Sequence, residues 1–141
     1  EGIEGDPVSV PGLGLLDVET VMTGDKRVTV TQAVHVASET AAQGYEIHIG
    51  RTEGPDRTRP MFHVEGQPEG AIRADGRVMG SYLHGLFTED AFRAAFLQSL
   101  GAQAGGTHYA QGVDETLDAL ADHLEEHSDC DGVLRIARAG V

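Results

Sequence analysis

Arg27-Val28-Thr29-Val30-Thr31-Gln32-Ala33-Val34-His35-Val36 is the stretch that sets the fold class, because its valines alternate with threonine, alanine and histidine. A period of two and many β-branched residues are typical of a strand with one buried face. Residues 44–49 and 61–64 are two further candidate strands. The first half of the chain is therefore expected to form a sheet.

Turn signals divide the rest of this region. Residues 71–73 and 77–83 flank Asp75-Gly76, a pair that favours a tight turn and predicts a hairpin. Residues 1–14 and 50–60 are rich in glycine and proline and are expected to be loops. Residues 15–18 could add one short strand.

In the second half the pattern changes to the period of a helix. Thr88 is placed to cap a helix that stops at Gly101, with Phe92, Phe96 and Leu100 as its buried stripe. After a glycine-rich link at residues 101–112, we expect a helix at 114–127 and a short one at 133–139. Strands followed by helices predict an α/β protein.

Composition excludes several classes of function. The 141 residues, one domain or part of one, carry a net charge of −13, which argues against nucleic-acid partners. No apolar run approaches the length of a membrane span, and these residues show no basic-then-apolar pattern typical of a signal segment. One cysteine fits a reducing cytoplasm. Because the chain begins with glutamate in a loop-like segment, we expect it to be a piece of a longer polypeptide.

His84 is the strongest candidate for a catalytic residue. It lies where an apolar strand ends, and the following residue, Gly85, has no side chain that could crowd the imidazole ring. A histidine that titrates near neutral pH can take a proton from a nucleophile and return it to a leaving group. The alternative is a histidine that only bonds a backbone group at the strand end.

Two segments carry a family resemblance. Residues 44–52, GYEIHIGRT, and 80–87, GSYLHGLF, together resemble the glutamine amidotransferase domain of cobyric acid synthases. Residues 11–20 and 52–60 extend the resemblance over nearly the whole chain, and the acidic helices at the carboxyl end match least. Cobyrinic a,c-diamide synthases and the enzyme that amidates lipid II have similar segments, but the HGLF and IGRT endings fit cobyric acid synthases better.

The resemblance implies a class I glutamine amidotransferase fold, a flavodoxin-like α/β sandwich. Residues 1–141 would be its carboxyl-terminal portion only, a partial domain without the half that bears the nucleophile and without the synthetase domain. In the family, a cysteine on a strand-to-helix elbow attacks the glutamine side-chain amide and ammonia leaves. His84 matches the family's catalytic histidine, which holds that cysteine as a thiolate and protonates the departing ammonia.

The resemblance also implies partners and cofactors. The ammonia would pass to the synthetase domain, where ATP and Mg activate corrinoid carboxylates for amidation in cobalamin synthesis. Glutamine is then the substrate of this domain, and the corrinoid is reached only through the synthetase domain. We expect no cofactor and no metal within residues 1–141. Because the family's nucleophile is not among them, the chain alone is expected to be inactive.

Four positions qualify this assignment. Cys130 cannot replace the nucleophile, since two aspartates flank it and no glycine elbow surrounds it. Leu86 stands where many class I enzymes have a glutamate that completes a triad, so the group that orients His84 is open. Glu46 and His48 share one strand face. They either border the glutamine pocket or help to position His84, or they are a polar pair that bonds adjacent loops.

Two readings without catalysis compete with this one. His123, His127 and Cys130 could ligate zinc and stabilise an interaction module, although histidines on an acidic helix are usually surface residues. The chain could also be a docking piece. Exposed strand edges and apolar surface would then make it self-associate.

Overall fold

The computed structural model describes residues 6, 8–103, 106 and 108–140. The chain forms two units, Glu1–Gly105 and Gly106–Val141, which are described separately. Residues 8–13 form the expected loop, whereas residues 1–5 and 7 lie outside the described residues. The same holds for residues 104, 105 and 107 of the predicted glycine-rich link.

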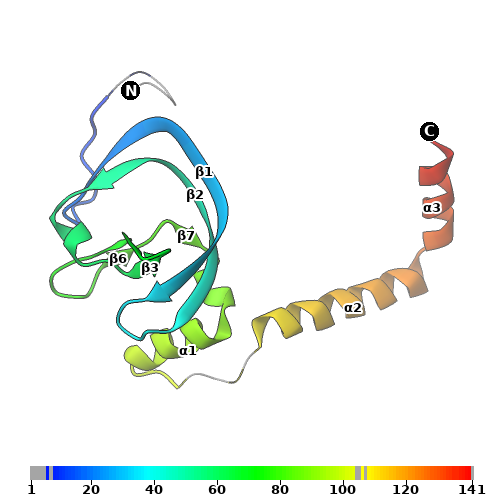
Figure 1. Ribbon diagram of the computed structural model, residues 1–141. Coiled ribbons are helices and arrows are strands. Elements are labelled where there is room, and N and C mark those ends of the chain that lie inside the picture. The colour runs from blue at the N-terminus through cyan, green and yellow to red at the C-terminus, as the bar shows by residue number, and fades with distance from the viewer. Residues whose placement is uncertain (1–5, 7, 104–105, 107, 141) are drawn as a thin grey trace. The chain divides into compact units, whose positions relative to one another are not determined.

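The first unit is built on a curled antiparallel sheet. Its two long strands, β1 (Glu19–His35) and β2 (Ala41–Glu53), pair antiparallel and curve together (Figure 1). The sheet order is β4-β3-β1-β2-β7, and every pairing between the described strands is antiparallel. The three short strands are β3 (Phe62–Val64), β4 (Gln67–Glu69) and β7 (Leu83–His84). The α/β class and the strands predicted near 27–36, 44–49 and 61–64 are confirmed.

The strands β1 and β2 are longer than their sequence patterns indicate. Residues 19–26 lack a clear period of two, yet residues 19–21 pair with 51–53 and Lys26 pairs with Ile49, with a register shift between Val21 and Lys26. The strand predicted at residues 15–18 is wrong, because residues 14–17 form a bend. There the Asp17 N–H donates to the Asp56 carboxylate at 2.8 Å, which joins this bend to the 3-10 helix η1 (Pro55–Thr58).

The hairpin predicted around Asp75-Gly76 is confirmed. It joins β5 (Ala71–Ile72) to β6 (Met79–Gly80) as a separate two-stranded sheet. Asp75 accepts hydrogen bonds from the Arg73 guanidinium and from the Arg77 backbone N–H. The bond from Arg73, followed by the one from Arg77, lowers the pKa of Asp75 to about 2. The aspartate therefore stays charged and keeps the turn closed at any ordinary pH.

The core of the first unit lies between the sheet and the helix α1 (Asp90–Ser99). Phe62 and Phe92 are fully buried, with smaller apolar side chains around them: Ala33, Ala42, Met61, Leu83 and Leu86. Thr88 does not cap α1. It belongs to the 3-10 helix η2 (Leu86–Thr88), where its hydroxyl donates to the Gly85 carbonyl at 2.7 Å, and Glu89 takes the cap position. Leu100 is exposed because α1 ends before it.

The second unit consists of α2 (Tyr109–His127) and α3 (Cys130–Ala139). Both predicted helices are confirmed and both begin earlier than predicted. The Asp129 carboxylate accepts the Gly132 N–H at 2.8 Å and so caps α3. The apolar stripe of α2 is about half exposed in this unit: Val113, Leu117, Leu120 and Leu124. Across the described residues, none of the helices has both the length and the apolarity that a membrane span requires.

His35 provides a test of the core. Its ring is buried between Phe62 and Phe92, with ring centroids 5.4 and 5.2 Å away, and its Nδ1 lies 2.8 Å from the Ser38 hydroxyl. Burial lowers the pKa of His35 below 6.5, because the charged imidazolium loses hydration in this aromatic site.

We expect this burial to make folding sensitive to mild acid. The unfolded chain takes up the His35 proton near pH 6.5, before the folded chain does. The stabilisation is therefore complete above pH 6.5 and is lost as the pH falls through the lower folded-state pKa. His35→Gln should reduce the drop in urea midpoint between pH 7.5 and 5.5, whereas His63→Gln, at an exposed position in β3, should not. Equal drops in both variants would contradict this assignment.

Candidate functional site

The predicted catalytic residue His84 lies on the end strand of the described sheet. It is the second of the two residues of β7, and it pairs with Tyr45 of β2. The two rings stack, with centroids 5.1 Å apart and planes 10° apart. Among the described residues, none forms a hydrogen bond with the His84 ring, and the residue is exposed. The imidazole is thus accessible for proton transfer.

Two glycines of the quoted segments make this position possible. A Cβ added to Gly44 would lie 2.5 Å from the His84 carbonyl oxygen, so only glycine lets β7 approach β2 here. Gly85 has a φ of 75°, and a Cβ there would lie 3.4 Å from the Tyr45 ring. The glycine after the histidine therefore serves the chain reversal that leads into η2.

Alternation along β2 separates the three predicted site residues. Tyr45 points to the face that carries the His84 ring, so Glu46 and His48 point to the opposite face. Leu83, which pairs with Glu46, is buried. The structure therefore brings Glu46 and His48 together on one face of β2 and places His84 on the other.

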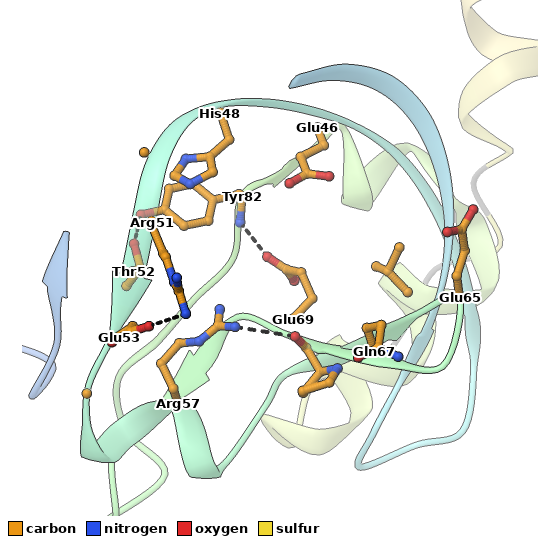
Figure 2. A pocket seen from close by; sticks show the side chains of 14 residues that line it. Glu46, His48, Arg51, Thr52, Glu53, Arg57, Glu65, Gln67, Glu69 and Tyr82 are labelled. Carbon is orange, nitrogen blue, oxygen red and sulfur yellow. Dashed lines mark hydrogen bonds and ion pairs between the residues drawn. The ribbon is translucent and has the colours of Figure 1, made fainter. Parts of the chain in front are cut away.

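Glu46 and His48 line a cavity of about 470 Å³ on the concave side of the sheet (Figure 2). The His48 ring packs against the Tyr82 ring, with centroids 3.7 Å apart. The charged groups in the lining are four carboxylates and two guanidiniums: Glu46, Glu53, Glu65, Glu69, Arg51 and Arg57. Arg51 pairs with Glu53 at 2.7 Å, and Arg57 donates to the Pro68 carbonyl at 3.4 Å. The cavity thus offers both charge signs to a ligand.

Two residues of this cavity were missed in the sequence. The Thr52 hydroxyl lies 2.5 Å from the Tyr82 hydroxyl and 2.7 Å from that of Thr20. Glu69 accepts hydrogen bonds from the Tyr82 N–H and the Ser81 hydroxyl, both at 2.8 Å (Figure 2 shows the first). Thr52 ends the GYEIHIGRT segment, but nothing in that segment indicates its contact with Tyr82. No motif or period marks Glu69, because both of its hydrogen-bond partners lie more than ten positions away in the chain.

The second unit gives the zinc alternative little support. The His123 and His127 rings lie one helical turn apart, with centroids separated by 4.4 Å. The Cys130 thiol donates to the Leu124 carbonyl oxygen at 3.5 Å. Within the described ranges, no three histidine, cysteine, aspartate or glutamate side chains are grouped to hold a metal ion.

Comparison with known proteins gives one consistent family. Residues 1–92 match the family model of the CobB/CobQ-like glutamine amidotransferase domain. The cobyric acid synthase of Rhodobacter capsulatus is 66% identical over 138 residues, which are 98% of this chain and 29% of that protein. Those of Bradyrhizobium diazoefficiens and Methylorubrum populi are 58% and 51% identical, over 98% of this chain and 29% and 28% of their lengths. The chain thus spans under a third of these relatives. No solved structure matches.

The close approach at Gly44 generates a direct test. Gly44→Ala should destabilise the first unit by about 1–3 kcal/mol, because the new methyl group overlaps the His84 carbonyl and must push β7 away from β2. Gly24→Ala is the matched control, since no atom lies within 4 Å of its added Cβ. Urea denaturation followed by circular dichroism measures both. A Gly44→Ala protein as stable as the control would show that β7 does not pack at this distance.

Proposed function

Because the chain belongs to the CobB/CobQ-like glutamine amidotransferase family, we propose that it is the carboxyl-terminal part of the glutaminase domain of a cobyric acid synthase. The family's domain is of the class I glutamine amidotransferase type, as the resemblance implied, and glutamine is its substrate. The named relatives favour cobyric acid synthase over the cobyrinic a,c-diamide and lipid II enzymes. In this proposal the ammonia amidates corrinoid carboxylates.

The observation that carries the proposal is the exposed His84 ring at the end of the sheet. A cysteine thiolate attacks the glutamine amide carbon, and the amide nitrogen leaves as ammonia with a proton donated by the His84 imidazolium, which becomes the neutral imidazole. The resulting thioester is then hydrolysed by water, which regenerates the thiol and releases glutamate. His84 acts first as the acid and then as the base that activates this water.

The face that carries His84 also indicates where the nucleophile comes from. Val28, Val30 and Ile47 project from the same face as Tyr45 and are 44–71% exposed. An apolar sheet face of this kind needs a cover. We propose that further sequence of the full enzyme, including the nucleophilic cysteine, packs on it. The isolated chain is then inactive and prone to self-association through this face.

Cys130 is a poor nucleophile in this scheme. Its thiol donates to the Leu124 carbonyl oxygen, and the residue is the first of α3 in the second unit, where no strand among the described residues leads into a glycine elbow. ATP and Mg belong to the synthetase domain in the proposal, and the enzyme works in the cytoplasm. The 141 residues contribute the glutaminase half-reaction only.

We further propose that Glu46 and His48 bind the part of glutamine that is remote from the reacting amide. The cavity offers the Glu46 carboxylate for the α-ammonium group and the guanidiniums of Arg51 and Arg57 for the α-carboxylate. It opens on the other face of β2, but β7 is a two-residue strand at the end of the described sheet. In this proposal the side chain of glutamine extends around the edge of β7, so that its amide meets the His84 ring.

His84→Ala tests the proposed chemistry in the full-length enzyme. Glutamine-dependent amidation should fall by about 10²-fold to 10⁴-fold, because the general acid and base is lost. Activity with free ammonia should be retained, since ammonia bypasses the glutaminase step. Steady-state rates with each nitrogen donor measure the two activities.

Cys130→Ser is the control for this experiment and should leave both activities unchanged. Equal loss of both activities in His84→Ala would assign the histidine a folding role. Full glutamine-dependent activity in that variant would reject the proposed function.

Glu46→Gln tests the proposed substrate contact. Loss of one charged hydrogen bond to the α-ammonium group should raise the KM for glutamine by about 10-fold or more, with ammonia-dependent activity unchanged. Glu39→Gln, the same substitution at an exposed position in the β1–β2 turn, should have no effect. An unchanged KM in Glu46→Gln would leave Glu46 a purely structural role.

A further inference from the structure

The position of His84 depends on the segment that precedes it. The β7 strand comprises only Leu83 and His84, and it is held to β2 by two residue pairs. The ring itself has no hydrogen-bond partner in the described part of the chain. So short a ladder at the end of a sheet cannot by itself fix a side chain to the accuracy that proton transfer demands. Residues 81–83 must therefore be held in another way.

One carboxylate holds all three of these residues. Glu69 Oε1 accepts the Tyr82 N–H at 2.8 Å, and Oε2 accepts the Ser81 hydroxyl at 2.8 Å. The Ser81 oxygen in turn accepts the Leu83 N–H at 3.0 Å. A carboxylate can accept at both oxygens, whereas a glutamine side chain presents an N–H₂ group at one of them. With a glutamine the Ser81 hydroxyl would have to accept from that group instead of donating to it, and both bonds would lose the strength that the charge gives, so the arrangement favours the charged residue.

Glu69 is itself anchored to the core. It lies in β4 opposite the fully buried Phe62, and its carbonyl accepts the Met61 N–H at 2.9 Å. The next residue, Gly70, has a φ of 76°, and a Cβ there would lie 2.6 Å from the Gly80 carbonyl oxygen. The Glu69 backbone is thus fixed against β3, and Gly70 lies against Gly80, next to the segment that the carboxylate holds.

We propose that Glu69 is a positioning residue for His84, which it acts on through Ser81, Tyr82 and Leu83 without touching substrate. This inference rests on the proposed function. It answers how the imidazole is oriented when Leu86 occupies the position of a triad glutamate. The carboxylate fixes the backbone of the strand instead of bonding the ring.

The test uses Glu69→Gln in the full-length enzyme. The kcat for glutamine hydrolysis should fall on the order of 10-fold to 100-fold, because a small displacement of a catalytic group is costly. The KM for glutamine and the ammonia-dependent rate should not change. Ser81→Ala should lower kcat by a similar factor. Ser81→Thr should keep much of the wild-type kcat, since threonine retains the hydroxyl. Glu39→Gln is the matched control.

A double-mutant cycle separates positioning from folding. Glu69→Gln should have no further effect on glutamine hydrolysis once His84→Ala is present, because there is then no imidazole to position. An equal additional loss in that background, or a parallel loss of ammonia-dependent activity, would overturn the inference. If His84→Ala reduces glutamine hydrolysis and Glu69→Gln does not, this inference alone fails. If His84→Ala has no effect, the proposed function fails with it.

Discussion

The close approach of two backbones at Gly44 is the constraint on which the site depends. The His84 carbonyl oxygen lies where any other residue at position 44 would have its side chain. This contact sets the register in which His84 faces Tyr45 and Leu83 faces Glu46. A slip of one residue would turn the histidine to the cavity side and expose Leu83. Register and function are therefore tied to a single glycine.

That register divides the polar residues of the site between two environments. The His84 ring lies on the apolar face of Val28, Val30 and Ile47, while Glu46 and His48 face a charged cavity. An apolar surface excludes water from the reacting groups once it is covered, and a charged cavity suits a zwitterionic ligand. One strand can serve both because its side chains alternate. Within the GYEIH segment, Tyr45 and Ile47 face the apolar side and Glu46 and His48 face the cavity.

The sequence predicted what repeats along the chain and missed what depends on distant contacts. The alternating valines of β1 and the apolar stripe of α2 identified both elements, because period reports a buried face directly. Residues 19–26 have no such period and form a strand only because β2 lies beside them. Thr88 has a side chain that can cap a helix, but it is already part of η2, where its hydroxyl donates to the Gly85 carbonyl. His84 was predicted from its motif, whereas the contacts of Glu69 exist only once β4 is folded against residues 81–83.

The residue two positions after the histidine shows why another group must take over its orientation. Leu86 is buried in the core with Phe62 and Phe92, so a carboxylate at this position would lose its hydration and destabilise the fold. Packing at Leu86 fixes the far side of His84, and Glu69 fixes the near side through hydrogen bonds that its charge strengthens. The His84 ring itself then stacks on the Tyr45 ring, which is its one aromatic contact among the described residues. An imidazole held through its backbone leaves the ring nitrogens unblocked, so in the proposed reaction the nitrogen that meets the nucleophile can pass its proton to the departing ammonia.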